Sequence, residues 1–392
     1  MSYSKLICTW HLVWILCEVE GGIALGILNT SLSMEDCNSA AAAGCREALV
    51  DAVAAIARRC EGEQAVVGIL LSGGVDTAAV LEANLLLARR KICPSLTIAK
   101  TFTVFASPAA SDRPYAAAVI RRHNLESKSL ALDVELKDVL KMVPFCVRTL
   151  KTFDPMTLRN AIVTALALHA AKAEGVSVAI TGDAADELLG GYSFCWEGAD
   201  EPLWSEKRDK LIDNSSFSAT SMAEALGMEA VSPFLEPIFI AWAKQSANKA
   251  ACISRDLHIE LAPDTERVQH ITGKACLRLA FPESPAAFRR KDPIEVGSGS
   301  TALRQTDFFS AYFTEAELER CKADYHSREK VRIRDREHLF YYNAFREEFP
   351  NDVPDLQRFG SDPCCECGYQ LKSPTEMFCR VCGAWPARTT AP

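Results

Sequence analysis

Two short segments of the chain carry the residue types that bind phosphate and a divalent cation. The first is the run SGGVDT, in which Gly73 and Gly74 permit close backbone approach and Ser72 and Thr77 add hydroxyl groups. Asp76 would repel a phosphate directly, so its natural role is to hold Mg²⁺ against one. The run lacks the lysine of a Walker A loop and the spacing of a dinucleotide-binding loop. A plain Gly-Gly turn between a strand and a helix is the simpler alternative.

Three carboxylates crowd the second segment, TGDAADELLGGY, which begins at Thr181. Asp183, Asp186 and Glu187 are unfavourable so close together unless a cation offsets their charge. Because ligands bind at the carboxyl ends of parallel strands, Asp76 and Asp186 are predicted to form a Mg²⁺ clamp there. The alternative is a solvated acidic helix start, which the helix dipole favours.

Four cysteines near the C-terminal end have the spacing of a structural zinc site. Cys364 and Cys367 form one C-x-x-C-G turn, and Cys379 and Cys382 form another after eleven intervening residues. Two such turns complete a tetrahedral Cys₄ site for Zn²⁺, whereas an isolated C-x-x-C would suggest a redox role. Cys365 is an alternative ligand with poorer spacing.

Composition limits the class of protein. The 392 residues are 48% hydrophobic and 24% charged, which is typical of a soluble globular protein with a full core. The net charge of −8 argues against nucleic-acid binding as the main task. Of the sixteen cysteines, the eleven outside the terminal group are scattered singly, which fits a reducing compartment and predicts a cytoplasmic location.

The two acidic segments need strands and helices to position them. The run AVVGILL before the first segment is apolar and β-branched, as in a strand buried on both faces of a parallel sheet. Asp154 and Pro155 start a helix well, because Asp caps free amides and Pro fits the first helical position. Strands are predicted over 65–71, 96–105 and 176–180, and helices over 40–59, 78–90, 113–122 and 155–173. This alternation predicts an α/β fold with a doubly wound parallel sheet, followed beyond about residue 205 by a mainly helical part.

The N-terminal stretch Leu6–Cys17 is apolar but too short to span a bilayer. It has the length of a signal-peptide core, yet no clean cleavage site follows it. A buried strand, or a mispredicted start with Met34 as the true one, is the favoured alternative. No membrane partner is expected.

Several motifs together resemble one known family. SGGVDT resembles the S-G-G-x-D-[ST] pyrophosphate loop of ATP pyrophosphatases. TGDAADELLGGY closely resembles the S-G-[DE]-G-[AS]-D-E-x-x-G-G-Y signature of the asparagine synthetase synthetase domain, which β-lactam synthetases share. Three further motifs follow in the family's order: GMEAVSPFLE at 227–236, Gly273-Lys274 with Leu277-Arg278, and Arg289-Arg290-Lys291. The resemblance covers roughly residues 45–310 and implies the ATP pyrophosphatase (adenine nucleotide alpha hydrolase-like) fold.

The resemblance implies an AMP-forming amide ligase. A substrate carboxylate, aspartate by default, attacks the α-phosphate of ATP, and an amine then displaces AMP from the acyl-adenylate. Lys291 would stabilise charge on the α-phosphate, and Asp183 would lie near the incoming amine as a proton acceptor. Mg²⁺ would bind Asp76 and Asp186, and ATP would be held by Ser72, Gly73, Gly74, Asp76, Thr77 and Gly182.

Departures from the family pattern fall on the acceptor half of the site. Ala184 replaces a glycine and Val231 replaces an arginine, whereas Thr77 keeps the hydroxyl of the usual serine. The second residue is Ser2 where a glutaminase would have its cysteine nucleophile. We therefore expect no glutaminase activity, and ammonia that is free or supplied by a protein partner, or another amine.

Two other functions stay open. One is a tRNA-modifying ATP pyrophosphatase whose zinc ribbon delivers the RNA, although the basic and acidic residues of 361–392 balance. The segment 327–349 mixes arginines with aromatics, and an amphipathic helix packed on the domain is favoured over a nucleic-acid surface. The other is a non-catalytic nucleotide-binding scaffold. The predicted divisions are an N-terminal extension at 1–44, the ATP pyrophosphatase domain at 45–350, a linker at 351–363 and the zinc ribbon at 364–392.

Overall fold

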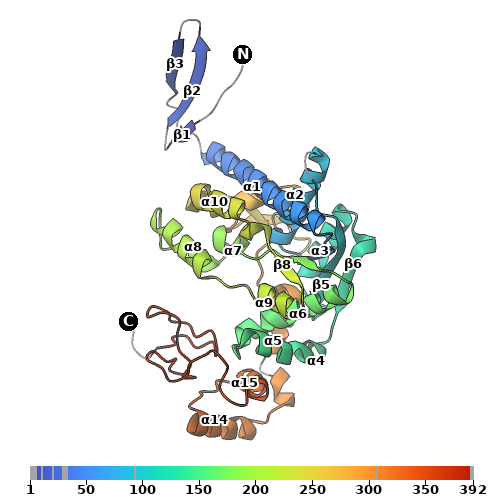
Figure 1. The fold of residues 1–392 in the computed structure, drawn as a ribbon, viewed down its shortest axis with the longest axis vertical. Coiled ribbons are helices and arrows are strands. Elements are labelled where there is room, and N and C mark those ends of the chain that lie inside the picture. The colour runs from blue at the N-terminus through green and yellow to red at the C-terminus, as the bar shows by residue number, and fades with distance from the viewer. Residues whose placement is uncertain are drawn as a thin grey trace.

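A five-stranded parallel sheet forms the centre of the protein (Figure 1). The computed structural model describes residues 7–9, 12–19, 22–28, 34–91, 94–305 and 307–388, with side chains from residue 40 onward. The strand order is β6-β5-β4-β7-β8, and every neighbouring pair is parallel. The strands are β4 (Val67–Leu70), β5 (Ile98–Phe105), β6 (Ser129–Asp133), β7 (Val178–Ile180) and β8 (Glu229–Val231). The order reverses between β4 and β7, so the predicted doubly wound α/β fold is confirmed.

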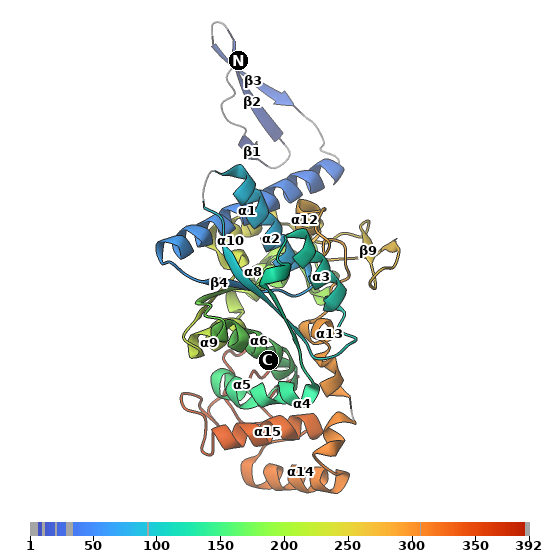
Figure 2. The same cartoon turned by 90° about the vertical axis from the view of Figure 1, so that its right-hand side faces the viewer.

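Alternate residues of the central strands enter two separate cores. Ile69 and Ile180 pack with α1 and α2 on one face, whereas Phe102 and Ala179 pack with α6 and α9 on the other. Figure 2 shows the resulting layers, with α1 and α2 above the sheet and α6, α5, α15 and α14 in succession below it. The first face is covered by α1 (Met34–Gly62), α2 (Val75–Arg90), α10 (Pro237–Ser246), α11 (Lys249–Cys252) and α12 (Ala275–Ala280). The second face is covered by α5 (Val143–Leu150), α6 (Pro155–Ala173) and α9 (Ser218–Ala225).

Local capping explains why α6 begins where the sequence predicts. Asp154 accepts hydrogen bonds from the amides of Met156 and Thr157, and Pro155 occupies the first helical position. The helices predicted over 40–59, 78–90 and 113–122 are also present, the last as α3 (Asp112–Arg122). The other α-helices are α4 (Leu136–Val139), α7 (Ala185–Leu188), α8 (Leu203–Asn214), α13 (Ile294–Ser298), α14 (Glu315–Glu329) and α15 (Arg336–Glu348).

The part beyond residue 205 is mainly helical as predicted, but it also contains three short strands that the sequence reading missed. One is β8, and the others are the antiparallel pair β9 (His258–Glu260) and β10 (Arg267–Gln269). In the segment 327–349, the aromatic residues Tyr341, Tyr342 and Phe345 of α15 are buried. The helix therefore packs its aromatic face on the domain, as expected.

Two further segments lie outside the central α/β unit, one before α1 and one after α15. Near the N-terminus, β1 (Ile7–Thr9), β2 (Leu12–Val19) and β3 (Gly22–Leu28) form an antiparallel sheet. Much of the stretch 6–17 is thus extended, whereas its interpretation as a leader, as a buried strand or as sequence before the true start stays untested. Residues 351–363 join α15 to the cysteine segment, and their placement as a linker stays a prediction. Within the described part of the chain, no helix is both long and apolar enough to cross a membrane.

Candidate active site

The glycine-rich turn presents the start of α2 to an open cavity. The chain leaves β4 at Leu70 and enters α2 at Val75, so Asp76 and Thr77 lie in the first helical turn. The Gly74 amide donates to Ser72 Oγ at 3.2 Å, and Thr77 Oγ1 donates to the Ser72 carbonyl at 3.4 Å. Free amides at such a helix start form an anion-binding site.

Gly73 is required by close packing at this turn. A Cβ atom there would lie 2.4 Å from the Asp112 carbonyl oxygen and 2.9 Å from a guanidinium nitrogen of Arg289. The turn is therefore pressed against α3 and against the segment that carries Lys291. This contact explains why the sequence has glycine at this position.

The acidic segment lies directly against the glycine-rich turn. It follows β7, which is the neighbour of β4 at the point where the strand order reverses. A Cβ atom on Gly182 would lie 2.8 Å from the Cβ of Asp76, so the two predicted segments meet. Ala184 has a φ of 74°, a left-handed conformation that costs a non-glycine residue about 1 kcal/mol. The glycine of the family pattern at this position is thus explained by the left-handed backbone conformation, which glycine adopts without this cost.

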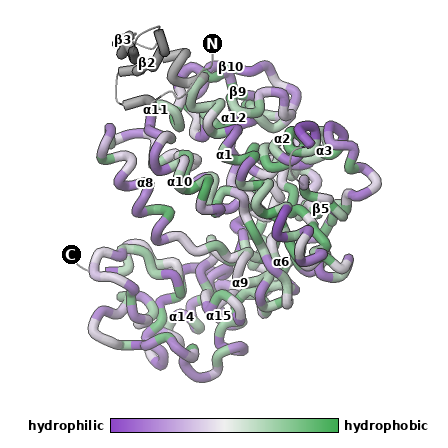
Figure 3. The backbone as a smooth tube through the Cα atoms, turned by 45° about the horizontal axis from the view of Figure 1, so that its top comes forward, coloured by the Kyte–Doolittle hydropathy of each residue, from purple (hydrophilic) through white to green (hydrophobic). Residues whose placement is uncertain are grey.

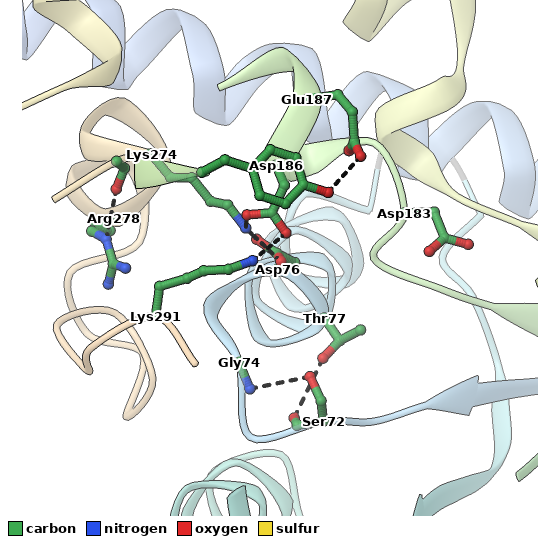
Figure 4. A network of polar contacts seen from close by, with 12 residues as sticks. Ser72, Gly74, Asp76, Thr77, Asp183, Asp186, Glu187, Lys274, Arg278 and Lys291 are labelled. Atoms are coloured by element: carbon green, nitrogen blue, oxygen red, sulfur yellow. Dashed lines mark hydrogen bonds and ion pairs between the residues drawn. The ribbon is translucent and has the colours of Figure 1, made fainter. Parts of the chain in front are cut away.

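A buried lysine joins the carboxylates of the two segments (Figure 4). Lys274 Nζ lies 2.7 Å from both carboxylate oxygens of Asp76 and 2.9 Å from Oδ1 of Asp186. Lys291 Nζ donates to the other Asp186 oxygen at 2.6 Å. Although burial acts in the opposite direction, these two lysines lower the pKa of Asp186 to about 2. Asp76, Asp186 and Lys291 are therefore in one network, with Asp186 ionised.

Lys274 is a site residue that the sequence reading did not assign. It is only 2% exposed, and its carboxylate partners raise its pKa above the ordinary value against the effect of burial. Gly191 makes room for it, because a Cβ there would lie 2.5 Å from the Lys274 side chain, and Gly273 allows the backbone before Lys274 to pack on the Gly190 carbonyl, 2.0 Å from where a Cβ would lie. The Gly273-Lys274 motif was the available signal.

Asp183 occupies a different electrostatic position from Asp186. Burial raises the pKa of Asp183 to about 6, and the nearby charges of Glu187, Asp76 and Asp186 add to this effect. Thr181 Oγ1 opposes it by donating to the Asp183 carboxylate at 3.0 Å. A carboxylate with a pKa near 6 can accept a proton at neutral pH.

Two buried arginines, Arg278 and Arg289, hold the backbone that leads to Lys291. Arg278 donates to the carbonyl oxygens of Gly273, Ala287 and Arg289 at 2.6–3.0 Å. Burial lowers the pKa of Arg278 to about 10, so it stays charged at neutral pH. Arg289 donates to Asp112 at 2.6 Å and stacks 4.4 Å from the centre of the Tyr115 ring. Neither arginine was predicted as a site residue.

The cavity bounded by these groups has a volume of about 290 Å³, and its lining combines charged and neutral side chains. All of the cations that line it among the described residues come from the segment 274–291. The walls from α6 and α9 carry neutral side chains, which are Asn160, Val163, Thr164, Ala167, Ser218 and Ala219. Val231 is not among the residues that line the cavity and packs in the core with α1 and α2.

The donor sets for metals differ between the two predicted sites. Asp76 and Asp186 offer the carboxylate oxygens that Mg²⁺ prefers. Asp186 Oδ1 is buried and lies 2.9 Å from Lys274 Nζ. The two carboxylates have the donor chemistry of a magnesium site, and their magnesium-binding role stays a prediction.

The predicted zinc cysteines lie together and are buried. The Sγ atoms of Cys364, Cys367, Cys379 and Cys382 all lie within 4.8 Å of one another. The pairs Cys364–Cys382 and Cys367–Cys379 are 3.7 and 3.6 Å apart. Thiolates around one tetrahedral zinc ion lie about 3.8 Å from one another, so this set fits zinc. Cys365 is exposed and outside the group.

Each cysteine pair is carried by a tight turn that ends in a left-handed glycine. We call residues 364–368 the first knuckle and residues 379–383 the second knuckle. The amide of Gly368 donates to the Cys364 carbonyl at 2.9 Å, and that of Gly383 donates to the Cys379 carbonyl at 2.8 Å. Their φ angles are 77° and 75°, which explains the glycine after each pair.

Comparison with known proteins agrees with this arrangement. The model of the family described as asparagine synthase matches residues 44–276, which include both acidic segments and Lys274. Over 243 residues the chain is 24% identical to asparagine synthetase [glutamine-hydrolyzing] 3 of Arabidopsis thaliana. That match covers 59% of this chain and only 40% of the plant protein. The family match extends over more than half of the sequence, and this chain therefore belongs to the asparagine synthase family.

Proposed function

We propose that this protein is an ATP-dependent amide ligase that forms AMP and pyrophosphate. The observation that carries the proposal is the network of Lys274, Lys291, Asp76 and Asp186 at the junction of the two acidic segments. It combines an anion-binding helix start with cations and with carboxylates that suit magnesium. Family membership supports a ligase that uses ATP.

In this proposal the β- and γ-phosphates of ATP lie at the glycine-rich turn. The amides at the start of α2, with the hydroxyl groups of Ser72 and Thr77, bind them, and Asp76 and Asp186 hold the Mg²⁺ that accompanies the phosphates. Lys291 lines the cavity and is paired with Asp186, and in this proposal it stabilises the charge that develops on the α-phosphate. Lys274 is too buried to contact a substrate directly, and its role is to hold the carboxylates of Asp76 and Asp186 in place.

The reaction then takes two steps. The substrate carboxylate forms a bond to the α-phosphorus of ATP while the bond to pyrophosphate breaks. An amine next attacks the acyl carbon, the C–N bond forms, the acyl–oxygen bond to AMP breaks, and the amine proton passes to Asp183. A pKa of about 6 suits Asp183 to this transfer at neutral pH.

The acceptor is proposed to be a small carboxylate, with aspartate as the default. Aspartate has a second carboxylate besides the one that is activated, and the described residues of α6 and α9 that line the cavity offer no cation to bind it. That second carboxylate would have to share the cations of residues 274–291 with the phosphates of ATP. Monocarboxylic acids therefore belong in the same assay.

The deciding experiment measures pyrophosphate release by the purified chain with ATP and Mg²⁺. The candidates are aspartate, monocarboxylic acids, ammonium and bulk tRNA, alone and in pairs, and Lys291→Met is the inactive control. Stimulation by a carboxylate with ammonium supports the ligase. Stimulation by tRNA alone overturns it in favour of RNA modification, and ATP binding without turnover on any acceptor overturns it in favour of a scaffold.

A further inference from the structure

The second knuckle is docked on the chain that leads into α6. Thr152 Oγ1 donates to the carbonyls of Arg380 and Val381 at 2.8 and 3.1 Å, and the Phe153 amide donates to Val381 at 2.8 Å. A Cβ atom on Gly383 would lie 2.0 Å from the Asp154 carboxylate. Since Asp154 caps α6, the knuckle touches the group that fixes the start of this helix.

The helix that begins at this contact forms one wall of the candidate active site. Asn160, Val163, Thr164 and Ala167 of α6 line the cavity. Arg159 of the same helix donates to Glu295 at 2.6 Å, and Glu295 lies four residues after Lys291. A shift at the start of α6 would thus reach both the wall of the cavity and the segment that carries Lys291.

The first knuckle has different contacts. A Cβ atom on Gly368 would lie 2.4 Å from the Phe359 ring, and the Cys367 carbonyl accepts from Arg358 at 2.9 Å. Glu366 makes an ion pair with Arg334 at 2.9 Å. These partners belong to the segments on either side of α15, so these contacts of the first knuckle lie within the C-terminal part of the chain. The two knuckles are therefore chemically alike and share Arg334, which also donates to the Cys382 carbonyl at 2.7 Å, but only the second also contacts the chain that leads into α6.

We propose that the zinc-bound second knuckle is a positioning element for the active-site wall. The metal holds Cys379 and Cys382 against the first knuckle, and the fixed turn holds Thr152, Phe153 and the Asp154 cap. Without the metal, the two knuckles would lose the metal–sulfur bonds that hold them together, and with them the free energy that fixes the turn. The consequence for activity rests on the ligase function proposed above, whereas the consequence for α6 does not.

The test compares Gly383→Ala with Gly368→Ala. Both substitutions place a methyl group at the same left-handed backbone conformation, but only the first forces it against Asp154. The readouts are zinc content, amide hydrogen exchange of residues 154–164, and the KM values for ATP and acceptor against kcat. We expect Gly383→Ala to accelerate exchange at the start of α6 by about tenfold and to raise KM more than it lowers kcat. Gly368→Ala is expected to leave exchange in α6 close to that of the unmodified protein.

Two further measurements keep the outcome decisive. Thr152→Val removes the hydroxyl bonds to the knuckle without altering any cysteine or glycine, together with the bond that the same hydroxyl accepts from the Asp154 amide. It is expected to accelerate exchange at the start of α6, and the part of the effect that depends on the knuckle is the part that zinc removal reproduces. Stripping the unmodified protein of zinc with a chelator is expected to do the same. Equal exchange of α6 in Gly383→Ala and Gly368→Ala variants that both retain zinc, or unchanged α6 exchange after zinc loss, would overturn the positioning role. Because exchange is measured without turnover, this result stands apart from any failure to find a substrate.

Discussion

The ammonium group of Lys274 lies 2.7 Å from each carboxylate oxygen of Asp76, although the two residues are 198 positions apart in the chain. The pair connects the start of α2 to the start of α12, and Asp186 joins it from the acidic segment. Three segments that are distant in sequence are thus fixed by one buried cation. Apolar residues of α1, α2 and α12 share one core around these segments, and in Figure 3, which colours the chain by hydropathy, green stretches lie near the labels α10 and β5.

Replacement of Lys274 with methionine is expected to leave Asp76 without its ion-pair partner and Asp186 with Lys291 alone. Breaking a buried ion pair in this way costs about 3–5 kcal/mol, because the Asp76 carboxylate keeps its desolvation without a partner. We expect a lower denaturation midpoint and lost ATP affinity, measured by denaturant titration and calorimetry. Lys141→Met is the control, since that lysine is exposed and pairs only with Asp138 three residues away. Equal behaviour of the two variants would show that the Lys274 network is not structural.

The substitution Gly182→Ala is expected to move the acidic segment that begins at Thr181 away from the glycine-rich turn that carries Asp76. Its methyl group would meet the Cβ of Asp76 at 2.8 Å, where neither backbone can yield cheaply. We expect a tenfold or greater rise in the KM for ATP–magnesium, on the order of 1.4 kcal/mol, with folding retained. Gly62→Ala is the matched control, because nothing lies within 4 Å of a Cβ at that helical position. An unchanged KM in Gly182→Ala would contradict the proposed shared magnesium site.

Local patterns were sufficient to predict the two acidic segments and the elements around them. A buried β-branched strand before Ser72, and the Asp154-Pro155 start of α6, both depend on neighbours within a few residues. The strand before Thr181 is equally local. Because parallel strands end at one edge, their loops could be expected to meet, and the contact between Gly182 and Asp76 agrees with that expectation.

Long-range partners were not predictable in the same way. The role of Lys274 depends on a contact with Asp76 across 198 residues. The helix that follows Lys274, α12, has only six residues, so no long periodic pattern in the sequence marks its position. The three-residue strand β8 is too short to show a period. The docking of Gly383 on Asp154 depends on complementary shape between two turns, for which a sequence pattern carries no signal.

The buried triad of Arg159, Glu295 and Glu337 should make stability depend on pH. Burial raises the pKa of Glu337 to about 7, although Arg159 opposes the effect. The folded state therefore binds a proton that the unfolded state releases above its ordinary pKa of 4.5, so this group's contribution falls as pH rises from about 4.5 to 7. Glu337→Gln is expected to remove that slope from the unfolding free energy measured against pH.

Arg159→Met tests the same triad from the other side. It leaves two carboxylates that are 14% and 9% exposed without their cation, at a cost of about 3–5 kcal/mol at pH 8. The cost should be smaller at pH 5, where Glu337 is protonated. A loss of stability that is the same at both pH values would contradict this account of the triad.

Asp183 is expected to govern the pH dependence of amide formation. Its pKa of about 6 means that the proton-accepting form appears as pH rises through 6, so kcat/KM should rise through that range and level off above it. Thr181→Val removes the hydroxyl that donates to the carboxylate, and should move the midpoint of the profile to higher pH. Asp183→Asn should abolish the rise and, in the absence of magnesium, also remove the loss of stability between pH 4 and 6 that comes from burying this charge. Initial rates and unfolding free energies across pH 4.5–8.5 check both effects, and a profile for Thr181→Val that coincides with that of the unmodified protein would assign the proton acceptor elsewhere.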